Sequence, residues 1–274
     1  MSKLTATLCL MIAVLLGSTG MSASADFQKG LTAYKSGDFA TARRIWEPLA
    51  QKGDVNALFR LGKLLLSNNL KEKGKEQTNK AVGLHYIGEA AKRGHPDALY
   101  ILATFYRNGT WPFKKDIVKA RDYFFRAAKN GHSFSQFLVG VFLHQSKNYD
   151  SAMEMLNSAH RGGEIKATVF LSDIYFKGLG VQKDVKRAFD YLIIAAENGD
   201  SLAQTQLGFF YANGIGTDRD LVKALMWNTV SYENNRSKHA LDNSQNYTKY
   251  MKLAQIEEAR VLAEKCIRRK YKDC

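Results

Sequence analysis

A short phrase that ends in glycine recurs along the chain. In each copy an alanine stands four residues before the glycine, usually with a second alanine beside it. The glycines that close the four copies are Gly94, Gly131, Gly163 and Gly199, and the gaps between them are 37, 32 and 36 residues. A period of this size predicts stacked helix pairs, each of which buries its apolar face against its neighbours. Such a stack lacks one central core, so the pattern favours a surface that binds partners over a buried catalytic centre.

The pattern within each period predicts an all-α fold. The 274 residues include only three prolines, and helical periodicity dominates over strand-like alternation. The clearest period covers residues 167–200, where Gly178 and Gly180 end one helix and Asp184 is placed to cap the next. Residues 203–233 and 98–131 repeat this plan, and small residues return at the same phase. We expect those small residues to let paired helix backbones approach closely.

Three periods are less regular. Residues 134–163 have a shortened turn, and residues 57–94 carry a polar, basic insertion at 67–80. Insertions in a solenoid fall in loops on one face, so this segment is either a contact arm or a mobile loop. Residues 27–53 resemble a tetratricopeptide helix pair, and as the terminal pair they should cap the stack.

The C-terminal part departs from the repeat. Residues 234–249 are polar and predict a linker with some helical turns, whereas residues 253–263 form a strongly amphipathic helix that should cover the last repeat. Cys266 and Cys274 follow. Two cysteines in an exported chain usually form a disulfide, which would close a short loop and stabilise the fold by about 2–3 kcal/mol at most. A reactive or metal-binding pair is the alternative.

The first 25 residues indicate export. Lys3 precedes an apolar run at residues 8–16, and Ala23-Ser24-Ala25 follows as a small-residue cleavage site. This order predicts a secretory signal peptide that is cut before Asp26, because the apolar run is shorter than the ~20 residues of a spanning helix. An uncleaved membrane anchor is the alternative. Cleavage gives a chain with no membrane span, and we expect it to be periplasmic or secreted.

The chain is strongly basic. The formal net charge is +14, and removal of residues 1–25 lowers it to +13. The excess favours an anionic partner. Export disfavours nucleic acid, which leaves an acidic protein, lipid headgroups or an anionic envelope polymer.

The repeats resemble the Sel1-like repeat family, a relative of tetratricopeptide repeats, of the exported bacterial type. The resemblance covers residues 57–233 well and 27–56 loosely. Its motifs are LGFFYANGIG at 207–216 with Asp220, Lys223, Ala224 and Trp227, and YFKGLGV at 175–181 with Asp184 and Ala188. The resemblance implies a right-handed α/α solenoid of about six helix pairs with a C-terminal capping helix, and an adaptor or scaffold role. The expected domains are a signal peptide at 1–25, a repeat solenoid at 26–233, and a linker, capping helix and disulfide-pinned tail at 234–274.

Catalytic motifs are absent from the sequence. It contains no P-loop, no G-x-S-x-G and no H-E-x-x-H, and its six histidines are scattered. His85 and Glu89 share a helix face, but one such pair is far short of a metal site. We therefore predict a chain that is not an enzyme and that carries no cofactor or metal.

The predicted function is a non-enzymatic scaffold of the bacterial envelope. It should bind a protein, acidic or envelope-associated, through a concave face lined by the first helix of each pair. The candidate contacts are Arg60, Lys63, Arg107 and Lys177, which recur near the exposed ends of first helices. The alternative is a binder, or in second place a hydrolase, of an anionic envelope polymer such as peptidoglycan or polysaccharide.

Overall fold

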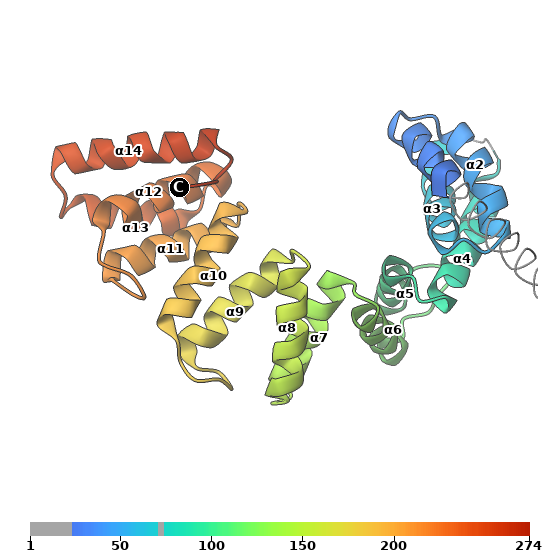
Figure 1. Cartoon of the computed structure of the whole chain (residues 1–274), viewed down its shortest axis with the longest axis horizontal. Coiled ribbons are helices and arrows are strands. Elements are labelled where there is room, and N and C mark those ends of the chain that lie inside the picture. Colours follow the sequence, from blue (N-terminus) through green and yellow to red (C-terminus); the bar gives the residue numbers. More distant parts are fainter. Residues whose placement is uncertain (1–23, 71–73) are drawn as a thin grey trace, which may run out of the picture. The chain divides into compact units, whose positions relative to one another are not determined.

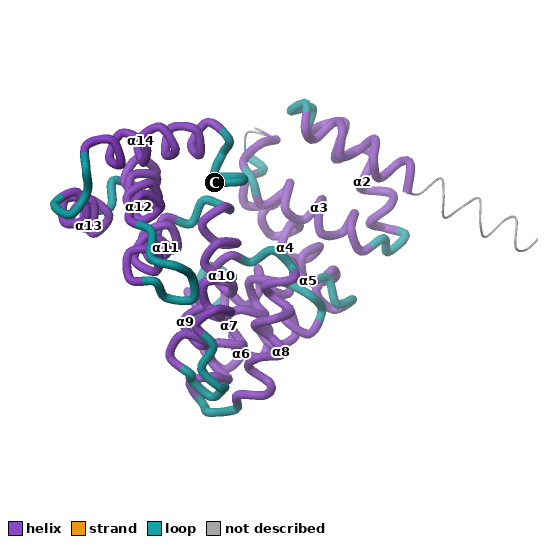
Figure 2. The backbone as a smooth tube through the Cα atoms, turned by 60° about the vertical axis from the view of Figure 1, so that its left-hand side comes forward, coloured by secondary structure: helices purple, strands orange, loops and turns teal. Residues whose placement is uncertain are grey.

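The computed structural model describes residues 24–70 and 74–274, and all regular structure in these ranges is helical (Figure 2). The all-α prediction is confirmed. The predicted signal peptide lies outside the described residues except for Ser24 and Ala25, and so do residues 71–73 of the 67–80 insertion.

The chain forms two compact units, which divide between His132 and Ser133 (Figure 1). The first unit contains a helix over residues 24–35, α2 (Phe39–Gln51), α3 (Val55–Leu66), the short η1 (Asn68–Leu70), α4 (Glu76–Lys92), α5 (Pro96–Asn108) and α6 (Ile117–Lys129). The second unit contains α7 (Ser133–Gln145), α8 (Tyr149–Arg161), α9 (Ile165–Lys177), α10 (Val185–Glu197), α11 (Ser201–Asn213), α12 (Leu221–Asn235), α13 (Lys238–Thr248) and α14 (Leu253–Arg268). The division falls within the predicted repeat domain 26–233, whose bounds stay a prediction.

Paired helices cross at small residues. A Cβ atom added to Gly62 of α3 would lie 3.0 Å from the carbonyl oxygen of Gly83 in α4, and one added to Gly208 of α11 would lie 2.9 Å from that of Ala224 in α12. Ser172 of α9 meets α10 in a similar way, since its hydroxyl donates to the Ala188 carbonyl oxygen at 2.8 Å. The corresponding positions of the α5–α6 and α7–α8 pairs are also small and buried: Ala103, Ala120, Gly140 and Ala152. Because interaxial distance depends on the side chains at the contact, small residues permit this close approach. The predicted role of the recurring small residues is confirmed.

The turns of the most regular pairs use two glycines for two different tasks. Gly178 and Gly214 adopt the left-handed conformation that ends α9 and α11. Gly216, with φ +69°, lies so close to α10 that an added Cβ would be 2.5 Å from the Val185 carbonyl oxygen. Gly180 lies in the same way against the ring of Tyr149 in α8. Gly180 and Gly216 therefore allow each turn to pack closely against the preceding helix pair.

Aspartates begin the second helices of these pairs, as the sequence predicts. Asp184 accepts a hydrogen bond from the Arg187 amide at 2.9 Å, and Asp220 accepts one from the Lys223 amide at 2.9 Å. Each bond satisfies an amide that has no partner within its helix.

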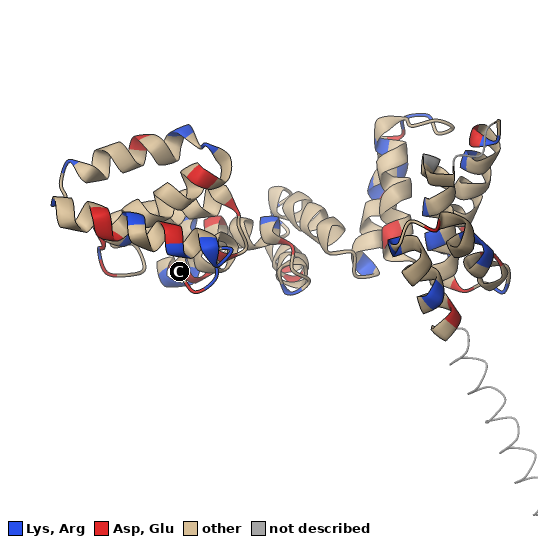
Figure 3. Cartoon of the chain, turned by 90° about the horizontal axis from the view of Figure 1, so that it is seen from above, with Lys and Arg blue, Asp and Glu red and all other residues tan. Residues whose placement is uncertain are grey.

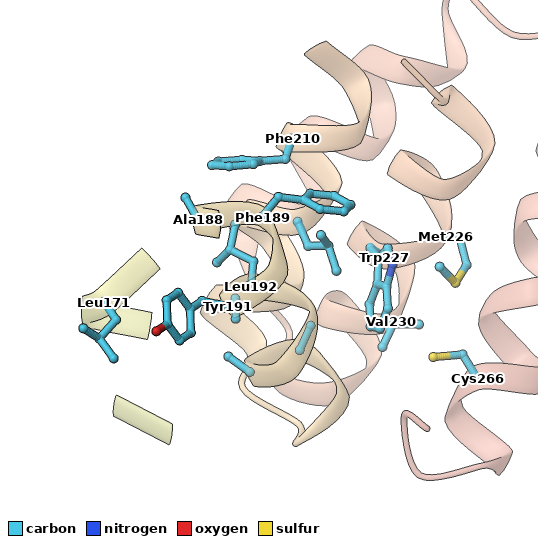
Figure 4. Close-up of a cluster of buried hydrophobic side chains, with 14 of the residues drawn as sticks. Leu171, Ala188, Phe189, Tyr191, Leu192, Phe210, Met226, Trp227, Val230 and Cys266 are labelled. Carbon is cyan, nitrogen blue, oxygen red and sulfur yellow. The ribbon is translucent and has the colours of Figure 1, made fainter. Parts of the chain in front are cut away.

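A continuous core links the helices of the second unit. Figure 4 shows Leu171 of α9, Leu192 of α10, Phe210 of α11 and Trp227 of α12 in one buried cluster. Each of these side chains is 5% exposed or less. The core thus runs from pair to pair, as stacked repeats require.

The segment predicted as a linker with helical turns contains a full helix, α13. Ser237 caps it by accepting a hydrogen bond from the Ala240 amide at 3.3 Å, and Ala240 is completely buried. Asn243 donates to the Asn228 side chain of α12 at 3.2 Å. The helix thus depends on its cap and on packing against neighbouring helices such as α12. A polar sequence with few branched apolar residues does not reveal such contacts.

The predicted capping helix is α14, and it packs on α12. Ala259, Ala263 and Cys266 form its buried stripe, and Cys266 lies near Met226 and Val230 of the core (Figure 4). This packing covers the apolar side of the last regular helix.

The structure joins Cys266 and Cys274 in a disulfide. The intervening tail lies against the turn between α10 and α11. A Cβ at Gly199 would lie 3.2 Å from the Tyr271 ring, and Lys272 Nζ donates to the Asn198 side chain at 3.2 Å.

Replacing Gly216 by alanine should destabilise the second unit by about 2–4 kcal/mol. The left-handed backbone and the overlap with Val185 each contribute about half of this loss. Gly88 of α4 has open space around it and no positive φ. As a matched control, Gly88→Ala should stabilise the chain by about 0.5–1 kcal/mol, because glycine is a poor helix former. Urea unfolding followed by circular dichroism measures both, and equal midpoints for the two variants would contradict the assigned role of Gly216.

Candidate partner-binding surface

A hollow lies between the first helices α9 and α11 of the second unit. It has a volume of about 260 Å³. Its walls are Phe176, Leu192, Phe209 and Phe210, with Ser172, Asp173, Lys177 and Gln206 as the polar lining. Pockets for small molecules usually measure about 300–1,000 Å³. The hollow is therefore better suited to one large side chain than to a drug-sized ligand.

Aromatic rings give the hollow its apolar character. Phe210 is buried, and its ring centroid lies 5.1 Å from that of Phe176. Phe209, the adjacent residue, is 46% exposed. Phe210 thus packs in the core, whereas the ring of Phe209 is in contact with solvent at the edge of the hollow.

An ion pair lies beside these rings. Lys177 Nζ is 2.6 Å from a carboxylate oxygen of Asp173, one turn earlier on α9. The hydroxyl of Ser172 donates to the Ala188 carbonyl oxygen at 2.8 Å, so it belongs to the helix crossing. Lys177, a predicted contact residue, therefore lies at this hollow, but the neighbouring Asp173 carboxylate partly neutralises its positive charge.

The other three predicted contacts belong to the first unit. Arg60 and Lys63 of α3 lie over the ring of Phe59, at 5.9 and 5.5 Å from its centroid. Arg107 of α5 lies 5.6 Å from the centroid of Phe124. Each cation thus covers an aromatic ring of its own unit. Arg60 and Lys63 lie over Phe59, and Arg107 lies over Phe124. Lys177 belongs to the second unit. Partner binding by this set therefore stays a prediction.

His95 lies against Phe59, the ring that Arg60 and Lys63 also approach. Its ring stacks on Phe59 with the centroids 4.1 Å apart, and its Nδ1 accepts a hydrogen bond from the Ala98 amide at 3.4 Å. Burial lowers the pKa of His95 below its ordinary value, although the nearby Asp97 carboxylate partly opposes this. The neutral imidazole caps α5, because only an unprotonated Nδ1 can accept the amide hydrogen.

Metal and membrane signatures are not seen in the described ranges. No group of three or more His, Cys, Asp or Glu side chains in them is arranged to hold a metal ion, and His85 and Glu89 have no third ligand there. None of the helices described combines the length and the apolar character of a membrane-spanning segment.

The exposed ring of Phe209 is not among the contacts predicted from the sequence, all of which are cations. Phe209, Phe210 and Tyr211 are consecutive, and a helix turns by about 100° per residue. Three adjacent aromatics cannot all face one core, so the run itself signals that at least one ring is exposed.

Sequence comparison identifies the repeats. The Sel1 repeat matches residues 55–95, 96–132, 165–200 and 201–227, just over half of the chain. The chain belongs to the Sel1 repeat family. Sel1 repeat proteins generally serve as scaffolds for protein–protein interaction. The α/α solenoid fold expected from the resemblance is that of this family.

Two solved structures share the fold. One is a protective antigen present in uropathogenic Escherichia coli strains, described as having an SLR fold; it is 26% identical, with a TM-score of 0.73 over 93% of this chain and 56% of its own. The other is a Sel1 repeat protein from Oxalobacter formigenes, 23% identical, with a TM-score of 0.66 over 88% of this chain and 99% of its own. The Sel1 chain therefore spans little more than half the length of the E. coli antigen. A comparison with curated protein sequences found no match to this Sel1 repeat chain.

The match to the repeat ends at Trp227, and two buried polar residues follow it on α12. Asn228 and Ser231 are both fully buried. The Ser231 hydroxyl donates to the Ser201 carbonyl oxygen at 2.7 Å and accepts a hydrogen bond from the Thr205 hydroxyl at 2.8 Å. These bonds fasten the last part of α12 to α11 in place of the apolar repeat positions.

Stability should fall as the pH drops from 7.5 to 5.5, partly because of His95. Its pKa in the folded chain lies below the ordinary 6.5, so the unfolded chain binds the proton first. The contribution of His95 is complete above pH 6.5 and is lost as the pH falls through the folded pKa. His95→Asn keeps a side-chain acceptor for the cap but does not titrate, so its urea midpoint should fall less over this range.

The control for this experiment is His239→Asn, which removes an exposed histidine. It should retain the wild-type dependence on pH. A pH dependence in the His95 variant that equals that of wild type would contradict the account of the buried imidazole.

Proposed function

We propose that this Sel1 repeat protein is a non-enzymatic scaffold that binds a protein partner on the first-helix face of its second unit. The observation that carries the proposal is the exposed ring of Phe209 beside the hollow between α9 and α11. The hollow accepts one large apolar side chain of the partner, which packs against Phe176, Phe209 and Leu192. The general scaffold role of the family supports this assignment.

The energetics favour the aromatic residues as the main source of affinity. Burying a phenylalanine side chain contributes about 1.5–3 kcal/mol, and a few buried aromatic anchors dominate most interfaces. The exposed Asp173–Lys177 pair lies at the edge and contributes little on its own, because exposed ion pairs are worth about 0–1 kcal/mol. The pair serves orientation and selects the charge of the partner residue that flanks the anchor.

The net charge of +14 favours an acidic partner, because long-range attraction accelerates its approach. Figure 3 shows Lys and Arg interspersed with Asp and Glu along the helices, so the positive excess is spread over the surface. This distribution supports steering more than a single basic contact site.

We place the protein in the periplasm or outside the cell. The predicted signal peptide supports export. The disulfide between Cys266 and Cys274 agrees with it, because disulfides persist mainly in oxidising compartments.

Phe209→Ser should weaken capture of the partner by about 30-fold, since truncation of a central aromatic anchor costs ~2 kcal/mol or more. The measurement is a crosslinking pull-down from the envelope fraction, followed by titration of the captured protein. Leu202→Ser is the matched control, because Leu202 is also on α11, is 58% exposed and lies outside the hollow. It should bind as wild type does.

Equal binding by the Phe209 and Leu202 variants would contradict the assignment of the hollow. Capture of peptidoglycan or polysaccharide that is abolished by salt and insensitive to Phe209→Ser would instead support the polymer-binding alternative. Lys177→Glu separates the predicted charge contact from the aromatic one: an acidic partner that pairs with Lys177 should be lost, whereas unchanged capture rejects Lys177 as a contact.

A further inference from the structure

The first unit exposes a tryptophan at the end of the α5–α6 helix pair. Trp111 lies in the turn between the two helices and is 56% exposed. The other two tryptophans of the chain, Trp46 and Trp227, are 0% and 3% exposed. Trp111 is therefore the one indole that a partner can reach on the chain as folded.

Other exposed apolar side chains accompany Trp111. Ile117 and Val118 form the start of α6 and are 56% and 70% exposed. They lie at the same end of the helix pair as the turn, because α6 begins where the turn ends. Three large apolar side chains within eight residues are thus in contact with water, where an ordinary surface places polar groups.

Two lysines lie between these apolar residues. Lys114 and Lys115 are exposed, and neither forms an ion pair with a residue in the described ranges. The nearby Asp116 is already engaged: it caps α6 through the Lys119 amide at 2.9 Å and lies 3.6 Å from Lys119 Nζ. The turn therefore presents two cations without a local counter-charge.

The body of the turn is fixed, so these residues keep their place. The Asp116 amide donates to the Tyr106 carbonyl oxygen at 2.8 Å, and the Phe113 ring lies 4.8 Å from that of Tyr106. Phe113 thus anchors the turn on the helix pair while Trp111, two residues earlier, remains in solvent.

The fold does not require a tryptophan here. In the equivalent turns of the second unit the position is glycine: Gly180 and Gly216 lie directly against the preceding pair. The turn after Gly109 is one residue longer and carries Trp111, Pro112 and Phe113 instead. An exposed indole that replaces a packing glycine points to a contact outside the chain.

We propose that this end of the α5–α6 pair docks on the surface of an anionic phospholipid bilayer. Tryptophan prefers the headgroup level of a membrane, and the branched chains of Ile117 and Val118 gain by entering the acyl boundary. Lys114 and Lys115 attract anionic headgroups. Ile117 and Val118 favour a bilayer over a polysaccharide, because neither side chain provides a ring on which a sugar can stack. This surface is separate from the protein-binding hollow on the second unit.

Intrinsic fluorescence of the full chain tests the proposal directly. Vesicles that contain phosphatidylglycerol should shift the Trp111 emission to the blue at low salt, and brominated lipids should quench it, whereas phosphatidylcholine vesicles should do neither. Trp111→Phe should abolish the shift, because the two remaining tryptophans are buried. The Lys114→Gln, Lys115→Gln double variant should bind these vesicles about 25-fold more weakly, at about fivefold for each lysine.

The matched control is the Lys35→Gln, Lys52→Gln double variant, which removes two exposed lysines of the first unit whose sequence neighbours include no exposed large apolar residue. It should bind vesicles as wild type does. The proposal is overturned if the emission is unchanged at low salt, if the two lysine double variants lose binding equally, or if vesicles bind without a change in Trp111 emission. Binding of soluble polyphosphate that matches vesicle binding, again with unchanged emission, would assign the turn to polyanions and not to a bilayer.

Discussion

The close crossing of two helices at a pair of small residues is the contact on which the rest of the structure depends. In three helix pairs a glycine or serine of the first helix meets a glycine or alanine of the second: Gly62 with Gly83, Ser172 with Ala188, and Gly208 with Ala224. Large buried residues adjoin these small ones, such as Leu61 beside Gly62 and Leu207 beside Gly208. Because the regular pairs repeat this crossing, they offer their neighbours the same shape, and within each unit the core extends from one pair to the next.

Sequence alone predicted the features that follow from local chemistry. The repeated phrase gave the period, the aspartates before Val185 and Leu221 marked helix starts, and the capping helix was evident from its apolar stripe. Helix α13 was missed because its stability comes from contacts with α12, such as the bond between Asn243 and Asn228. Tertiary contacts of this kind leave no periodic signal in a polar segment.

The candidate site could be predicted only in part. The positive charge of Lys177 marks it as a candidate in the sequence, and the residue does lie at the hollow, but Asp173 partly neutralises that charge. Phe209 was absent from the predicted set because helical periodicity cannot show which of three consecutive aromatics a neighbouring pair will cover. The difference between Phe209 and Phe210 is set by how α11 packs on α9 and α10, and this is a property of the fold.

Departures from the repeat are where this chain acquires its individual surfaces. Trp111 occupies a turn position that is glycine in the α9–α10 and α11–α12 pairs, and polar side chains such as Ser231 replace apolar repeat positions where α12 meets α11. The repeat supplies a rigid frame, and substitutions that the frame tolerates are free to serve binding. The two proposed surfaces therefore need no change in the crossings that hold the helices together.

The most direct test of the central claim is native-state hydrogen exchange on Gly208→Leu. The leucine has no room at the crossing of α11 and α12, where an added Cβ already meets the Ala224 carbonyl oxygen at 2.9 Å. The account predicts that, relative to wild type, the variant loses amide protection to a similar extent in α11 and in α12. The first unit should lose less protection than these two helices. Protection in both helices equal to that of wild type would contradict it.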